Sequence, residues 1–106
     1  MDVSHRLTET ANPSKGPAKP LLLFFTRRTS GPARRMESLI AHIARKERRR
    51  LTVVSVDADA NSDLADRLRV TEIPTIVLVK ERSPVGRLEG RATGGQIDEL
   101  INRLVA

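Results

Sequence analysis

The side chains that could do chemistry in this sequence are few, and the thiol is missing from them. The 106 residues include no cysteine, so the chain has no thiol nucleophile, no disulfide and no thiolate ligand for a metal. Ser30 is a hydroxyl in a suggestive position, directly before Gly31-Pro32. No His or Lys is placed to act as its base, so we do not expect a catalytic serine. A serine before Gly-Pro instead predicts the N-cap of a helix.

The remaining candidate ligands are scattered along the chain. His5 and His42 are solitary, and we expect neither to be functional. Asp57 and Asp59 follow a predicted strand, where turn chemistry explains them better than a metal site does. We therefore expect neither a metal ion nor a cofactor.

Positive charge is concentrated in one segment of the chain. Residues 27–50 carry nine Lys and Arg against two Glu, a net charge of +7, whereas the whole chain has +6. A localised positive field favours anionic partners such as nucleic acid, an acidic protein or a lipid surface. The candidate anion-binding residues are Arg34, Arg35, Arg45, Lys46, Arg48, Arg49 and Arg50.

Two simpler explanations of this basic segment stay open. Cations near a helix C-terminus complement the helix dipole, and this alone can explain their presence. A general preference for arginine is the second, because Arg outnumbers Lys 15 to 4 in the whole chain. Sequence-specific recognition of nucleic acid is not expected, since Phe24 and Phe25 are the only aromatic residues and no recognition motif is present.

The apolar pattern predicts strands and helices that alternate along the chain. Strands are predicted at 21–26, 51–56, 75–79 and 85–88, and helices at 32–49, at 62–69 and from Thr93 onward. The helix over 32–49 places its apolar residues on one stripe and its arginines largely toward solvent. Pro84 predicts that the last strand lies at a sheet edge. Thr93 and Gln96 have the spacing of a capping box.

The first 18 residues differ in composition from the rest. Pro13, Gly16 and Pro17 exclude a helix across them, so we expect a flexible N-terminal tail or a short edge strand at 3–7. One domain is expected from 19 to 106. The longest fully apolar run, 21–25, is far shorter than the ~20 residues that span a bilayer, and no apolar leader is visible. A cytoplasmic location without membrane attachment is therefore the expectation.

Five short stretches, in order along the chain, resemble thioredoxin. They are Lys19-Pro20-Leu21-Leu22-Leu23-Phe24-Phe25 as the central strand, Ser30-Gly31-Pro32-Ala33 where the family has Cys-Gly-Pro-Cys, Val56-Asp57-Ala58-Asp59-Ala60-Asn61, Val70-Thr71-Glu72-Ile73-Pro74-Thr75 with the family's Ile-Pro-Thr, and Gly90. The resemblance covers residues 19–106. It implies a thioredoxin-like three-layer α/β/α sandwich, with a mixed central sheet, a cis peptide bond before Pro74 and a shortened or disordered N-terminal β-α part.

The resemblance also implies a set of catalytic groups, and each of them is replaced here. Ser30 stands at the attacking cysteine and Ala33 at the resolving cysteine. Phe24 stands at the buried acid and Ser55 at the lysine, while two threonines replace the flanking tryptophans. We therefore predict a degenerate member that is not an enzyme, because both the thiols and the proton-transfer groups are gone.

The resemblance implies that the family's peptide-binding face is kept although the catalytic groups are lost. There the residue before the cis-proline, Ile73 in this chain, offers backbone groups to an extended peptide. The candidate partner-binding residues are Arg27, Arg28, Thr29, Glu72, Ile73, Pro74, Gly90 and Arg91. Their charge favours a partner of matching charge over promiscuous apolar binding.

Three functions remain open from the sequence. The first is a redox-inactive protein-binding or scaffold module that acts through the Ser30/Pro74 face, as a monomer or weak oligomer. The second is an anion- or nucleic-acid-binding protein that acts through the basic helix at 34–50. The third is a non-catalytic accessory subunit of a redox enzyme.

Overall fold

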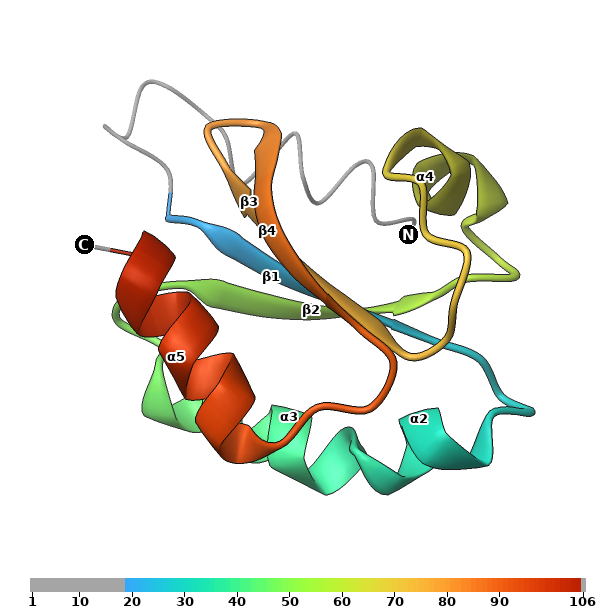
Figure 1. Cartoon of the computed structure of the whole chain (residues 1–106), viewed down its shortest axis with the longest axis horizontal. Coiled ribbons are helices and arrows are strands. Elements are labelled where there is room, and N and C mark those ends of the chain that lie inside the picture. Colours follow the sequence, from blue (N-terminus) through green and yellow to red (C-terminus); the bar gives the residue numbers. More distant parts are fainter. Residues whose placement is uncertain (1–18, 106) are drawn as a thin grey trace.

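Two continuous apolar runs form the middle of the sheet in the computed structural model, which describes residues 19–105 (Figure 1). β1 (Leu21–Thr26) and β3 (Thr75–Lys80) each bury five consecutive residues, the pattern of strands that are covered on both faces. β2 (Thr52–Asp57) and β4 (Ser83–Glu89) flank them, in the order β2-β1-β3-β4. β1 pairs with β2 in parallel and with β3 antiparallel, so the sheet is mixed, as predicted.

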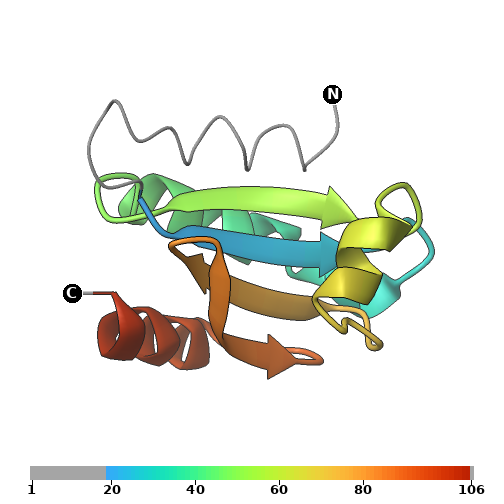
Figure 2. The same ribbon diagram turned by 90° about the horizontal axis from the view of Figure 1, so that it is seen from above.

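Helices cover both faces of this sheet and give the predicted three layers. α2 (Gly31–Arg35), α3 (Glu37–Lys46) and α5 (Gly94–Leu104) lie on one side, and α4 (Ser62–Arg67) lies on the other (Figure 1). Figure 2 shows that α4 crosses one end of the strands. Each side has its own apolar cluster, and the side chain of Ile73 packs against both.

Neighbouring residues of β1 point into opposite clusters because side chains alternate along a strand. Leu22 and Phe24 belong to the cluster under α2, α3 and α5, whereas Leu23 and Phe25 belong to the cluster under α4. Phe24 is 1% exposed and Phe25 is fully buried. The two phenylalanines, the only aromatic residues of the chain, therefore fill one core each.

The prediction of one helix over 32–49 is wrong in two respects. The helix is divided at Met36, whose N–H donates to the carbonyl oxygen of Ala33 three residues back (3.1 Å), a tightened turn of 3₁₀ type. α3 then ends at Lys46. Glu47, 8% exposed, turns its carboxylate inward to accept a hydrogen bond from Arg50 Nε (3.1 Å). Residues 48–50 form a turn beyond the helix.

The hairpin between β3 and β4 is tighter than the predicted turn at 81–84. Its two loop residues, Glu81 and Arg82, have positive φ values of 52° and 69°. Primed two-residue turns require such values because they match the twist of the paired strands. The register shifts after Leu78, where the extra residue Val85 stands 41% exposed. β4 is the last strand in the sheet order, which confirms the edge position inferred from Pro84.

The predicted capping box at the start of α5 is confirmed. Thr93 Oγ1 accepts a hydrogen bond from the Gln96 N–H (3.1 Å), and Gln96 Oε1 accepts one from the Thr93 N–H (2.8 Å). Within residues 19–105, no helix is long and apolar enough to cross a membrane. The expected tail or edge strand at 1–18 lies outside the described residues.

Candidate functional site

The Ser30-Gly31-Pro32-Ala33 turn joins β1 to α2, and Ser30 acts there as a helix cap. The Ser30 Oγ accepts a hydrogen bond from the Ala33 N–H (3.2 Å), and Pro32 lies in the first turn of the helix. The hydroxyl oxygen thus pairs with a backbone N–H in the first turn of α2 that has no partner within the helix, which is the usual role of an N-cap serine. Ala33 is fully buried in the cluster under the helices, where it adds only apolar contact.

The positions behind this turn hold no group that could transfer a proton. Phe24, which stands in the place of the family's buried acid, is surrounded by aliphatic side chains of one core cluster. Ser55 pairs with Phe24 in the β1–β2 register, so both side chains lie on the same face of the sheet. Ser55, on β2, is exposed. General acid–base catalysis needs a titratable side chain, and neither residue supplies one.

The loop before β3 is anchored from both sides. Thr75 Oγ1 donates a hydrogen bond to the carbonyl oxygen of Glu72 (2.5 Å), and the Gly90 N–H donates one to the carbonyl oxygen of Pro74 (2.8 Å). The peptide bond between Ile73 and Pro74 is cis. Between these anchors, the backbone N–H and C=O of Ile73 make no backbone hydrogen bond to any residue in the range 19–105. Ile73 therefore has one backbone donor and one backbone acceptor without a backbone partner among residues 19–105.

Four charged side chains are predicted for this face. The Arg27 Nε donates to Asp59 Oδ1 at 2.9 Å, so Arg27 is engaged by an ion pair that the sequence did not indicate. Arg28 and Arg91 are exposed, as is Thr29. Glu72 is also exposed, and its carboxylate lies over Gly90, which adopts a φ of +80°.

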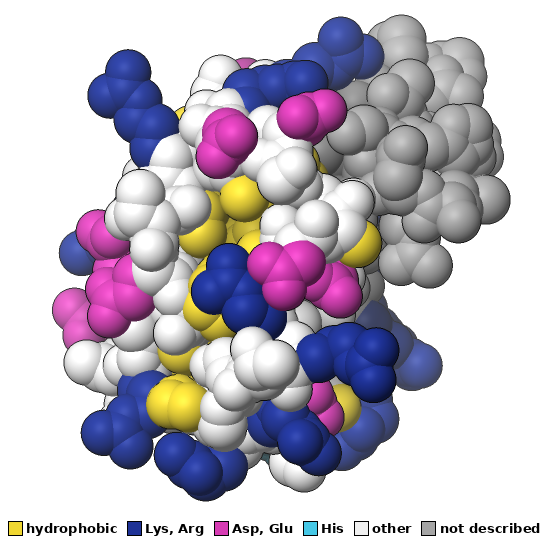
Figure 3. Space-filling view, turned by 90° about the vertical axis from the view of Figure 1, so that its right-hand side faces the viewer, with side chains coloured by type: hydrophobic (Ala, Val, Ile, Leu, Met, Phe, Trp, Pro, Cys, Tyr) yellow, Lys and Arg dark blue, Asp and Glu magenta, His cyan; other side chains and the backbone are white. Residues whose placement is uncertain are grey.

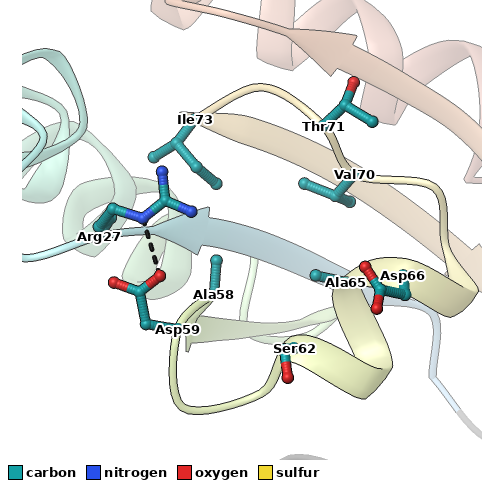
Figure 4. A pocket seen from close by; sticks show the side chains of 9 residues that line it. All are labelled: Arg27, Ala58, Asp59, Ser62, Ala65, Asp66, Val70, Thr71 and Ile73. Carbon is teal, nitrogen blue, oxygen red and sulfur yellow. Dashed lines mark hydrogen bonds and ion pairs between the residues drawn. The ribbon is translucent and has the colours of Figure 1, made fainter.

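A pocket of about 200 Å³ opens beside Ile73, between the end of β1 and α4 (Figure 4). It brings Arg27 and Ile73 together with residues that were not predicted as site residues: Ala58, Asp59, Ser62, Ala65, Asp66, Val70 and Thr71. Figure 3 shows this side of the molecule, where small apolar areas are surrounded by basic and acidic side chains. The signal in the sequence was the pair of small residues Ala58 and Ala65, which leave space where larger side chains would fill it.

Comparison with known proteins places this geometry in a family. The family model of thioredoxin matches residues 8–103. The chain belongs to the thioredoxin family.

Individual thioredoxins resemble the chain over different lengths. A thioredoxin-like protein of Synechocystis is 29% identical over 105 residues, which are 99% of this chain and all of that protein. The thioredoxin of Mycobacterium tuberculosis is 35% identical over 72 residues, 68% of this chain and 62% of its own length. The crystal structure of the germline-specific thioredoxin Deadhead of Drosophila melanogaster has a TM-score of 0.81 at 26% identity, and the match covers 96% of this chain and 91% of that one.

This thioredoxin lacks the thiols of thiol–disulfide exchange, because its sequence contains no cysteine. The Ser30 hydroxyl caps a helix and Phe24 lies in an apolar core, so neither residue supplies a group for acid–base chemistry. The scaffold is therefore that of a thioredoxin, while the reactive groups are absent from it.

The basic segment divides into paired and unpaired side chains in the structure. Lys46 Nζ donates to Asp98 Oδ1 (2.9 Å), and Arg50 binds both Glu47 and Asn102, so these two cations hold α3 and its final turn against α5. The others make no ion pair with residues 19–105 and are exposed: Arg34, Arg35, Arg45, Arg48 and Arg49. Two of the seven predicted anion-binding residues thus have a structural role.

Proposed function

We propose that this chain is a redox-inactive thioredoxin that binds an extended segment of a protein partner at the Ile73 loop. The available backbone N–H and C=O of Ile73 are the observation that carries the proposal. An extended peptide uses such groups to add itself as a strand. The anchors at Thr75 and Gly90 hold the loop in place, so little conformational entropy is lost when a partner binds.

The charges around the loop support selective rather than promiscuous binding. Glu72 in the loop adds negative charge, and Arg91, directly after the anchor Gly90, adds positive charge; both are exposed. Arg28 is exposed in the turn after β1 and adds a second positive charge. Charges at the rim of an interface mainly suppress wrong partners and speed the encounter with the right one. The chain is then a binding module and not an enzyme.

A pair of charge-swapped proteins tests this face. The site variant combines Arg28→Glu with Glu72→Lys, and the control combines Arg103→Glu with Glu99→Lys on α5. Both leave the net charge at +6. Each protein is used as bait in an extract of the native cell, and captured proteins are quantified by mass spectrometry. We expect specific partners to be lost with the site variant and kept with the control. Equal capture by all three proteins would show that this face is not the binding surface.

A second function is favoured by one observation, the three exposed arginines at and beyond the end of α3. Arg45, Arg48 and Arg49 make no ion pair with residues 19–105, whereas their neighbours Lys46 and Arg50 do. We propose, as the alternative, that this group binds phosphates of nucleic acid without reading sequence. Binding of that kind arises from release of counterions and weakens steeply with salt.

Salt titrations of binding to duplex DNA and to single-stranded RNA test the alternative. The variant Arg45→Glu/Arg48→Glu/Arg49→Glu brings the net charge from +6 to zero, and so does the control Arg67→Glu/Arg82→Glu/Arg103→Glu. We expect the logarithm of the affinity to fall by about 0.9 per neutralised phosphate for each unit of log salt on DNA. Only the first variant should abolish binding. Equal losses in both variants, or no micromolar binding at low salt, would exclude this function.

A further inference from the structure

We propose that the pocket beside Ile73 receives one basic side chain, Lys or Arg, of the bound segment. We name it the Arg27–Asp66 pocket, after two of its lining residues. The inference rests on the proposed function, because it names the residue that the segment at Ile73 carries. It adds a specificity element that backbone pairing alone would not supply, since backbone groups are the same in every peptide.

The size of the pocket matches one side chain. Its volume is about 200 Å³. Pockets for metabolites and drug-sized ligands are larger, about 300–1,000 Å³. A cavity of about 150 Å³ is already sufficient for a benzene molecule. A single side chain of five or more heavy atoms is therefore the occupant that the volume allows.

One part of the pocket wall is apolar and suits an aliphatic stem. Ala58 and Ala65 are each 6% exposed, and they face Val70 and Ile73 across the pocket (Figure 4). The side chains of Ser62 and Thr71 point away from it. Lys and Arg bury their methylene stems against such apolar surfaces while the charged head stays near solvent.

The charges at the mouth favour a cation. Arg27 is already engaged by Asp59, 2.9 Å away, so that pair contributes no net charge. Asp66 also lines the pocket, and it makes no ion pair with residues 19–105. The lining therefore carries a net charge of −1 on a molecule whose total is +6. Arg67 and Arg69, the cations nearest in sequence, are not among the lining residues.

The position of the pocket fits a strand added at Ile73. Side chains of an extended peptide alternate between the two faces of the strand, so every second one points at the protein. Ile73 supplies one wall of the pocket and the two backbone groups that have no backbone partner within 19–105. A residue of the segment next to the backbone pairing can therefore direct its side chain between Ile73 and α4.

Short labelled peptides that differ in one side chain test the inference. The probes are fluorescein-labelled pentapeptides of the form Ala-Thr-X-Thr-Ala, in which X is Lys, Arg, norleucine or Glu. Norleucine keeps the aliphatic stem and removes the charge. Fluorescence polarisation is suitable because a small labelled peptide tumbles more slowly once it is bound to the protein. We expect the Lys and Arg peptides to bind about three- to tenfold more tightly than norleucine, and the Glu peptide to bind most weakly.

Two variants on α4 separate the pocket from the general charge of the surface. Asp66→Lys changes a lining residue, and Asp63→Lys makes the same charge change at an exposed residue of the same helix that does not line the pocket. We expect Asp66→Lys to remove the preference for Lys over norleucine, and Asp63→Lys to retain it. Loss of the preference in both variants would overturn the inference, and so would tightest binding of the Glu peptide.

The failure of this inference differs from the failure of the proposed function. If all four peptides bind the unaltered protein equally, the pocket does not select a cation, whereas binding at the Ile73 loop stands. If none of the peptides binds at concentrations up to about 1 mM, the inference is wrong, whereas the proposed function is decided by the capture experiment with the charge-swapped proteins.

Discussion

At the scale of single residues, four positions explain why thiol–disulfide exchange is missing. Ser30 caps α2 through its hydroxyl, and Ala33 is buried beneath the helices. Phe24 is a core residue, and Ser55 beside it is exposed. Restoring sulfur alone would therefore restore a nucleophile without the groups that move its protons.

The double variant Ser30→Cys/Ala33→Cys tests this argument. We expect its insulin-reduction turnover to be lower than that of an ordinary thioredoxin by a factor of about 100 or more, because positioned acid–base groups contribute about 10²–10⁴ to such rates. The assay compares the variant with an active thioredoxin under the same reductant. Turnover within tenfold of the active protein would contradict the role that we assign to Phe24 and Ser55.

At the scale of elements, the fit between α5 and β4 depends on a glycine. A Cβ atom on Gly86 would lie 2.5 Å from Leu104 Cδ1 and 3.0 Å from Leu100 Cδ1. A side chain at position 86 would therefore displace the ends of these two leucines from the contact between β4 and α5. Gly95, in the first turn of α5, has no such constraint, since its Cβ would meet only Thr93 Oγ1 at 3.9 Å.

Substitutions at these two glycines should change stability in opposite directions. We expect Gly86→Val to lower the free energy of unfolding by about 1–3 kcal/mol through overpacking. Gly95→Ala should raise it by up to about 1 kcal/mol, because alanine is the better helix former. Urea unfolding followed by circular dichroism measures both changes, as the chain has no tryptophan to report by fluorescence. Equal stability of the two variants would show that α5 does not pack on β4 in this way.

At the scale of the whole molecule, the sheet is the middle layer between two buried apolar cores. The cluster under α2, α3 and α5 and the cluster under α4 each contain one phenylalanine, and these phenylalanines are neighbours in β1. Both phenylalanine side chains are almost completely buried. Neither face of the sheet is therefore dispensable for folding.

Truncation of either phenylalanine tests the two-sided core. We expect Phe24→Ala and Phe25→Ala each to lower the free energy of unfolding by about 3–5 kcal/mol. That is a large part of the about 5–15 kcal/mol of a typical domain, so both variants should populate the unfolded state at moderate temperature. Thermal unfolding measured by circular dichroism gives the comparison. A variant that keeps the unaltered melting temperature would show that its face of the sheet is not a true core.

Most of the architecture could be predicted from the sequence because it depends on local patterns. The apolar run at 21–25 determined a central strand, Thr93 and Gln96 determined the start of α5, and Pro84 placed its strand at an edge. The absence of cysteine determined by itself that thiol exchange is missing.

The tertiary structure alone decided which charged side chains form ion pairs and where the pocket lies. The helix over 32–49 divides at Met36 and ends at Lys46. Lys46 and Arg50 bind Asp98 and Asn102, each 52 residues away in the chain, contacts that no periodicity reveals. Arg27 is paired with Asp59, 32 residues away in the chain, and the pocket beside this pair exists only because separate parts of the chain meet there. Short-range preferences act between residues near in sequence, whereas pairing and hollows depend on which distant side chains the fold brings together.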